Sequence, residues 1–250
     1  MKRVLSVILS IIIACSCLTC VFSAGTKEVT VDVIYHQTEA RSILGRINEL
    51  RTSDDAWYLN KDNTTKTYCH GLSALEYDYD LEQFAMLRAA EIALNFSHTR
   101  PDGTLSVYGF TGTTRAENIA AGYTNAGMVQ EAFEEVDEDY AGQGHRRNML
   151  NSSITAVGIA CAEYNGRKYW VQEFRAPTGS TVETVANDGP ATVTVTVTDT
   201  GNDPGTNQDN PGDNGGQDNQ NDAGGNWFDA IIAFFRSIID FFIMLFNMFN

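Results

Sequence analysis

The sequence has little cysteine, proline and positive charge. Its 250 residues include five cysteines, five prolines, and 17 Lys and Arg against 32 Asp and Glu, which gives a formal net charge of −15. Three of the cysteines lie within residues 15–20, so only Cys69 and Cys161 remain further along the chain. Neither has a CxxC neighbour, which excludes the usual thiolate metal site. We expect these two cysteines either to form a disulfide or to be buried together as small hydrophobic side chains.

The scarcity of basic residues also limits the partners of the chain. After Arg175 the only basic residue is Arg236. An acidic chain repels phosphate backbones, and no basic stripe with interleaved aromatic residues is present. We therefore expect no binding to nucleic acid. No internal repeat occurs at a period of about 20–50 residues, which excludes solenoids and propellers.

Residues 1–24 have the pattern of a signal peptide. Met1-Lys2-Arg3 precede an apolar run over residues 4–14. A region of small residues then ends near Ser23-Ala24, where a signal peptidase would cleave. The apolar run is shorter than the roughly 20 residues that a transmembrane helix needs. A second interpretation is that Ile12-Ile13-Ala14-Cys15 resembles a bacterial lipoprotein cleavage box, with Cys15 as the lipidated first residue. Either way, we expect a secreted protein that is extracellular or associated with the cell surface.

Between residues 38 and 176 the hydrophobic spacing predicts helices followed by a hairpin. Helical periodicity appears over residues 38–51 and 80–95, and again after Thr124-Asn125 as far as Val136. Residues 52–68 are polar and predict a long connection. Two β-rich runs, residues 156–161 and 168–174, flank the turn pair Asn165-Gly166 and predict a β-hairpin. This order indicates an α+β layered fold.

The sequence changes character after Pro177. Val193, Val195 and Val197 alternate with threonines, so residues 177–199 are expected to form an edge strand or a linker ribbon. Residues 200–226 contain no large apolar side chain and predict a flexible acidic linker.

Residues 227–250 are so rich in Ile, Leu and Phe that they predict a hydrophobic C-terminal helix. Asp229, Arg236 and Asp240 interrupt the run and disfavour a transmembrane span, because charges at mid-membrane depth are costly. Attachment to a membrane surface or to a protein through residues 227–250 is the favoured interpretation. A span and docking on the chain's own core remain the alternatives.

Three residues outside the predicted apolar faces are candidates for a functional site. His98 follows the second predicted helix, where Pro101 and Gly103 turn the chain. Glu117 lies in a short apolar stretch, where a carboxylate is expensive to bury without a partner. His145 follows a glycine that frees the backbone before a predicted helical turn. Imidazoles and carboxylates are ligand types that suit zinc or a similar divalent cation.

Four ordered stretches resemble the signatures of bacterial CAP domains, the superfamily of cysteine-rich secretory, antigen 5 and pathogenesis-related-1 (SCP-like) proteins. They are Phe96-Ser97-His98-Thr99-Arg100-Pro101-Asp102-Gly103, Ala116-Glu117-Asn118-Ile119-Ala120, Gly144-His145-Arg146-Arg147-Asn148-Met149-Leu150 and Tyr169-Trp170-Val171-Gln172-Glu173-Phe174. The resemblance predicts a CAP domain over residues 40–176. It implies an α-β-α sandwich with a central antiparallel sheet.

The resemblance also implies a cleft that gathers two histidines and two acidic residues. His98, Glu117 and His145 fall on three of those positions, and Glu135 is our choice for the fourth, with Glu134 and Glu138 as alternatives. His98, His145 and Glu117 are the expected metal ligands. The spacing between Glu135 and His145 is longer than in many bacterial members, and the usual Trp before the acid is absent.

These features favour a binding or interaction module that takes a divalent cation and a small molecule or lipid. No Ser or Cys lies by motif beside a histidine, so nucleophilic catalysis has no candidate and an enzyme is not the favoured interpretation. The alternative is a metal-assisted hydrolase of peptide or cell-wall material, with Glu117 or Glu135 as general base. A purely structural role for the His and Glu side chains is the third interpretation.

Overall fold

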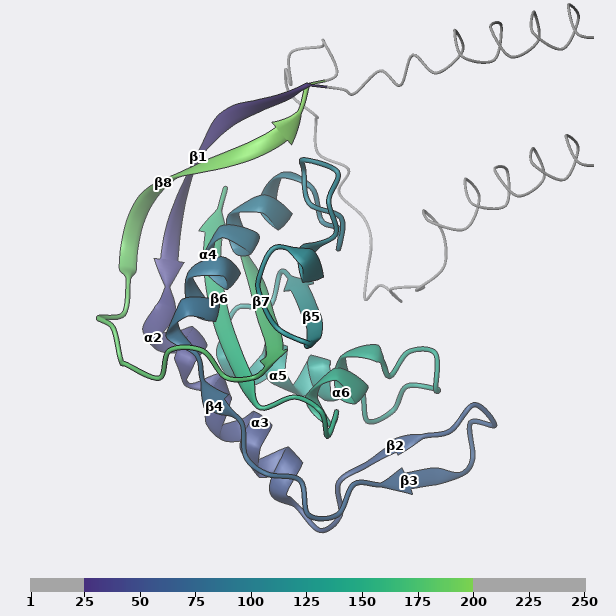
Figure 1. Cartoon of the computed structure of the whole chain (residues 1–250). Coiled ribbons are helices and arrows are strands. Elements are labelled where there is room, and N and C mark those ends of the chain that lie inside the picture. The colour runs from purple at the N-terminus through teal and green to yellow at the C-terminus, as the bar shows by residue number, and fades with distance from the viewer. Residues whose placement is uncertain (1–24, 200–250) are drawn as a thin grey trace, which may run out of the picture.

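A computed structural model describes residues 25–199 of the chain (Figure 1). The predicted signal peptide, the predicted acidic linker and the predicted C-terminal helix lie outside these residues, as does Cys15. None of the helices between residues 25 and 199 has the length and apolar content that a membrane crossing requires.

The centre of the fold is a mainly antiparallel sheet with the strand order β5-β7-β6-β1-β8. Its strands are β1 (Thr26–His36), β5 (Thr114–Ala121), β6 (Ala156–Tyr164), β7 (Arg167–Ala176) and β8 (Asp188–Thr198). A short strand, β4 (Glu76–Tyr77), pairs parallel with β6. β2 (Trp57–Leu59) and β3 (Lys66–Tyr68) form a separate hairpin.

The predicted hairpin is confirmed as β6 and β7, with Asn165 and Gly166 at its turn. Their φ angles of 52° and 76° are both left-handed, as a two-residue hairpin turn requires.

Helices cover both faces of this sheet. α4 (Tyr79–Leu94) packs on one face, and Figure 1 shows it running over β6 and β7. The other face carries α2 (Gln37–Arg41), α3 (Ile43–Thr52), α5 (Ala126–Glu134) and α6 (Gly144–Met149). Because side chains alternate along a strand, Val157, Ile159 and Cys161 of β6 enter the core under α3 and α5, while Ala160 and Ala162 enter the core under α4. The predicted α-β-α sandwich is therefore confirmed.

Several element boundaries differ from the sequence predictions. The helix expected over residues 38–51 is divided at Ser42 into α2 and α3. The third helix ends at Glu134 rather than Val136, because Glu135 adopts a left-handed conformation. Residues 52–68, expected to be a connection, contain the β2–β3 hairpin, and β1 and β5 were not predicted.

The valine and threonine alternation near residue 195 belongs to an edge strand of the main sheet. All eleven residues of β8 pair with β1 without interruption, from Asp188 opposite His36 to Thr198 opposite Thr26. The two-stranded ribbon of β1 and β8 extends beyond the other strands in Figure 1.

The two cysteines are not paired, and only one is buried. Cys161 lies in the middle of β6 with no exposed surface. Cys69 directly follows β3 at the base of a hairpin and is partly exposed. The expectation that both cysteines would pair or be buried together is therefore wrong for Cys69.

Candidate functional site

His98 and Glu117 form the first of two histidine–carboxylate pairs. The loop after α4 carries His98, and β5 carries Glu117. His98 Nδ1 lies 2.7 Å from Glu117 Oε1, and the side chains are 42% and 1% exposed, respectively. The carboxylate is thus buried beneath an imidazole that faces solvent. A carboxylate that is hydrogen-bonded to Nδ1 favours the tautomer with its proton on Nδ1. The lone pair of Nε2 then remains available for a ligand.

Arg88 keeps Glu117 ionised. Its Nε donates to Glu117 Oε2 at 2.7 Å, and its Nη2 donates to the other carboxylate oxygen at 3.3 Å. Nη2 also donates to the carbonyl of Ser97, the residue before His98. Burial raises the pKa of Glu117, but hydrogen bonds from His98 and Arg88 outweigh it and lower the pKa to about 2. Arg88 therefore fixes both the charge and the position of this pair.

His145 and Glu135 form the second pair. His145, in α6, directs Nδ1 at Glu135 Oε1, and the other oxygen of Glu135 accepts from the backbone N–H of Arg146 at 3.1 Å. Glu134, an alternative from the sequence, instead lies 3.8 Å from Arg46. Glu135 caps the C-terminus of α5 with φ 45° and ψ 44°, a conformation that favours glycine. Residues other than glycine in this conformation cluster at functional sites.

Two asparagines connect the pairs. The Asn118 amide donates to the carbonyl of His145 at 3.2 Å. The Asn148 amide donates to the carbonyl of Glu117 at 3.2 Å and to Asn118 Oδ1 at 2.8 Å. These bonds hold α6 against β5 at the position of Glu117, so the two pairs lie in the same part of the molecule. That the four side chains line a single cleft stays a prediction.

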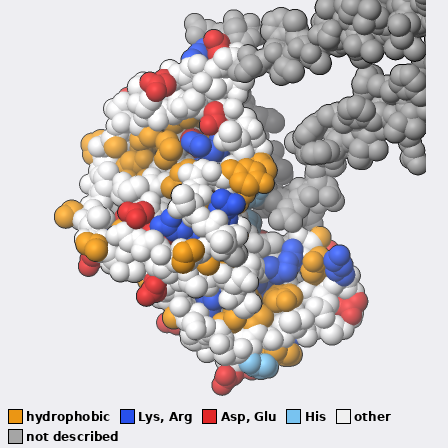
Figure 2. Space-filling model, viewed as in Figure 1, with side chains coloured by type: hydrophobic (Ala, Val, Ile, Leu, Met, Phe, Trp, Pro, Cys, Tyr) orange, Lys and Arg blue, Asp and Glu red, His pale blue; other side chains and the backbone are white. Residues whose placement is uncertain are grey.

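The backbone of the β2–β3 hairpin forms hydrogen bonds with Gln143 and Arg146, which in turn contact Glu135 and its neighbour Glu134. Gln143 accepts from the backbone N–H of Leu59 at 2.7 Å and donates to the carbonyl of Glu135 at 3.0 Å. Arg146 Nε donates to the carbonyl of Trp57 at 2.5 Å, and its guanidinium lies 4.8 Å from the centre of the Trp57 ring. Although the whole chain is acidic, Lys and Arg side chains gather over the middle and lower part of the face in Figure 2.

The described residues do not form a complete metal site. Between residues 25 and 199 no group of three or more His, Cys, Asp or Glu side chains is arranged to hold a metal ion. The donor chemistry nevertheless fits a divalent cation, because metal-binding histidines usually have a carboxylate on their second nitrogen. Both Glu117 oxygens already accept hydrogen bonds from His98 and Arg88, which suits a supporting carboxylate better than a ligand.

Glu173 is a buried acid that the sequence did not single out. It lies on β7 directly opposite Glu117 and has no exposed surface. Within the described part of the chain, neither of its carboxyl oxygens has a hydrogen-bond partner. Burial and then the charge of Glu117 raise the pKa of Glu173 well above its usual value. We therefore take Glu173 as the neutral acid beside the ionised Glu117.

Replacing Glu173 with glutamine is expected to stabilise the protein at neutral pH but not near pH 4. A raised folded-state pKa means that the native state holds a proton which the unfolded state releases, so stability falls as pH rises above the unfolded value of 4.5. While Glu173 stays protonated in the native state, each pH unit above 4.5 costs about 1.4 kcal/mol, and an uncharged amide avoids this cost. Urea unfolding of both proteins between pH 4 and pH 7 measures the difference. Glu28→Gln, at an exposed position, is the control; a gain for Glu173→Gln that does not vary with pH would contradict the assignment.

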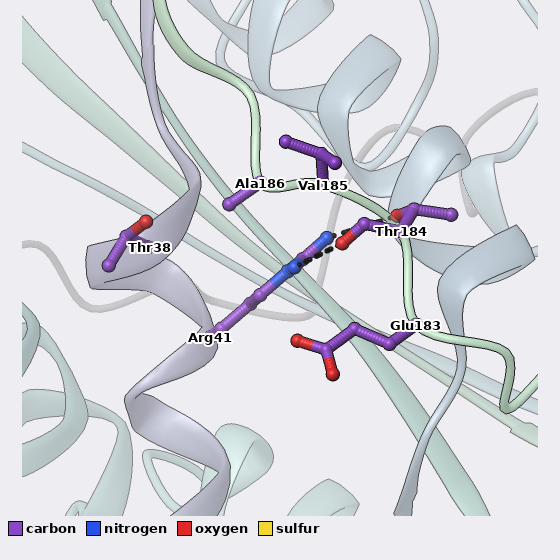
Figure 3. Close-up of a pocket in the computed structure, with 6 residues that line it drawn as sticks. All are labelled: Thr38, Arg41, Glu183, Thr184, Val185 and Ala186. Carbon is purple, nitrogen blue, oxygen red and sulfur yellow. Dashed lines mark hydrogen bonds between the residues drawn. The ribbon is translucent and has the colours of Figure 1, made fainter.

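Two surface hollows lie away from both pairs. The first, of about 480 Å³, is lined by Thr38, Arg41 and residues 183–186 (Figure 3). The Arg41 guanidinium donates to both oxygens of Glu82 and to the carbonyl of Thr184, so its charge is already balanced. The second, of about 390 Å³, lies around Arg51, which donates to the carbonyls of Ser73 and Asn151. Neither hollow contains a residue predicted for the site.

Comparison with known proteins gives one family match. The model of the cysteine-rich secretory protein family, CAP, matches residues 44–174. No curated protein matches the sequence.

Several solved structures are similar to parts of the chain. An outer surface protein from Borrelia burgdorferi is 20% identical over 57% of this chain and 95% of its own, with a TM-score of 0.42. A cysteine-rich secretory protein from Staphylococcus aureus is 20% identical over 55% of this chain and 38% of its own, with a TM-score of 0.36. NaASP2, crystallised with Zn²⁺, is 18% identical over 62% of this chain and 85% of its own, with a TM-score of 0.43.

Proposed function

Because this chain belongs to the CAP family, whose model matches residues 44–174 of its 250 residues, we propose that it is a secreted binding module for a divalent cation and a small ligand. The cation, such as zinc, would be held by His98 and His145. Glu135 would act through His145, and Glu117, which the sequence predicted as a third ligand, would act through His98 instead of binding the cation. Attachment to a membrane surface or a protein through residues 227–250 is part of the same proposal.

The observation that carries this proposal is the repetition of one arrangement. Each histidine has a carboxylate on Nδ1, and each carboxylate is itself held by further hydrogen bonds, from Arg88 to Glu117 and from the Arg146 backbone to Glu135. Carboxylates in this position orient imidazole ligands and increase their basicity. A bound cation would supply a Lewis-acidic centre with positions open to an oxygen ligand.

Binding is favoured over hydrolysis by the state of Glu117. A general base works best when its pKa lies near the working pH. Glu117 has a pKa of about 2 and is occupied by His98 and Arg88, so it is a poor base. The ligand itself is proposed only by class, a small molecule or lipid.

Calorimetric titration of the metal-free protein with zinc chloride tests the proposal. We expect His98→Ala and His145→Ala each to abolish binding or to weaken it by more than about 100-fold, since losing even a supporting group costs 10- to 100-fold. His36→Ala and His70→Ala are the matched controls, because these histidines contact Glu163 and Tyr68 instead.

A further variant separates a binding role from a structural one. Glu135→Gly removes the carboxylate but relieves the left-handed backbone, so it should keep the fold stable while weakening zinc binding by about 10- to 100-fold. Unchanged zinc affinity in both histidine variants would refute the proposal. Hydrolysis of peptide or cell-wall material that disappears in Glu117→Gln would establish the enzyme interpretation instead.

A further inference from the structure

The outer edge of β8 presents an open row of backbone groups. In an antiparallel pair, successive residues direct their N–H and C=O groups alternately toward the partner strand and away from it. Asp199 N–H donates to Gly25, on the β1 side, whereas Thr198 N–H donates to Pro101, away from β1. By alternation, Thr192, Thr194 and Thr196 also direct their backbone groups away from β1. Within the described part of the chain, β8 pairs with no other strand.

The ends of this row are closed. Pro190 falls on the outward row and has no N–H, and Thr198 uses its N–H on Pro101 at 2.8 Å. The open segment is therefore Thr192 to Thr196, and it is symmetric about Thr194.

Between Thr192 and Thr196 the row lacks the features that usually protect a sheet edge. Natural edge strands avoid pairing with other chains by carrying charged residues, bulges or covering segments. Residues 189–198 contain no charge, and β8 pairs with β1 one residue to one along its whole length. β1, by contrast, carries Lys27, Glu28 and Asp32.

The sequence of β8 is complementary to itself. From Thr192 to Thr198 threonine and valine alternate, so the segment reads the same in both directions. Val195 is buried with α4 and Val193 and Val197 pack around it, while Thr192 and Thr194 are exposed on the other face. An antiparallel copy of this strand would place threonines opposite threonines and valines opposite valines. The apolar face and the polar face of the sheet would then each continue from one copy into the other.

We propose that β8 pairs antiparallel with β8 of a second copy of this chain, about a twofold axis at Thr194. Thr192 would then exchange backbone hydrogen bonds with Thr196 of the second copy, and the two main sheets would become one. A contact built on one short strand is small, so the dimer should dissociate on dilution.

Thr194→Pro tests the pairing without disturbing β1. Its N–H faces away from β1, so proline removes a donor from the outer edge only. Thr30→Pro is the matched control, because Thr30 pairs directly with Thr194 and directs its N–H to the opposite edge of the ribbon. Sedimentation velocity of the full chain in mild detergent, over a concentration series, measures the association.

We expect the wild type and Thr30→Pro to shift from monomer to dimer with concentration, and Thr194→Pro to remain monomeric. Far-UV circular dichroism checks that each variant is folded. If proline prevents folding, Thr194→Lys replaces it, with Thr30→Lys as its control. Lysine at the twofold axis places two like charges together and should weaken association by at least about 10-fold. A monomeric wild type, or equal association of the Thr194 and Thr30 variants, would overturn the proposal.

Discussion

Replacing Arg88 with methionine is expected to lower the free energy of unfolding by roughly 3–5 kcal/mol, because it leaves buried carboxylates without their counter-charge. The Arg88 side chain is fully buried and lies 2.7 Å from both Glu117 and Glu91. Glu91 keeps a second arginine, Arg100, also at 2.7 Å, whereas among the described residues Glu117 keeps only the imidazole of His98, so most of the loss should come from Glu117. Urea unfolding at neutral pH measures the change.

Two further variants show whether this loss comes from the buried charge. Arg46→Met removes an arginine that lies 3.8 Å from Glu134 at the surface, and it should cost about 1 kcal/mol or less. Adding Glu117→Gln to Arg88→Met removes the unpaired charge and should recover part of the stability. Equal costs for Arg88→Met and Arg46→Met would show that Arg88 does not stabilise Glu117.

Gly158→Ala is expected to cost about 3 kcal/mol or more and to weaken zinc binding as well. A Cβ at this position would lie 2.4 Å from the backbone of Leu81 and of Glu82 in α4. Backbone atoms cannot rotate out of the way as a side chain can, so α4 would have to move off the sheet. The same helix carries Arg88, and Gly158 pairs with Glu173 on β7, so the movement would separate Arg88 from Glu117.

Gly45→Ala is the control for this prediction. Nothing lies within 4 Å of a Cβ at Gly45, which is exposed in the first turn of α3, so alanine there should stabilise the protein by up to about 0.5–1 kcal/mol. Thermal unfolding and zinc titration of the two variants give both readouts. A Gly158→Ala protein with wild-type stability would show that α4 does not approach β6 this closely.

Much of the fold could be predicted because its signals are local. The helical spacing of residues 80–95 and the Asn165-Gly166 turn both depend on residues close in sequence, and both are correct. β1 carries valines at 29, 31 and 33 in the same alternation as β8, and it could have been predicted from them. β2 and β3 have three residues each, too few to show a period. β5 escaped prediction because Glu117 and Asn118 are polar although buried.

The residues of the candidate site likewise divide into those that could be predicted from the sequence and those that could not. His98, Glu117 and His145 could be chosen because each lies in a distinctive stretch of the sequence, whereas Glu135 was chosen from the resemblance to CAP domains alone. Glu173 also lies in one of these stretches, but its role, like that of Arg88, arises only when α4 and β7 pack beside β5. The single local signal for Arg88 is a charged pair, Arg88 and Glu91, spaced i,i+3 on a helix whose buried side is otherwise largely apolar.

The pairing of β1 with β8 also brings the two ends of the described fold together. The backbone of Asp199 donates to the carbonyl of Gly25 at 2.6 Å, so the chain enters and leaves the described fold at one point. Figure 1 shows the β2–β3 hairpin at the opposite pole of the molecule. An anchor at either end of the chain would therefore be joined to the domain at the pole opposite the hairpin that supports Glu135 and His145.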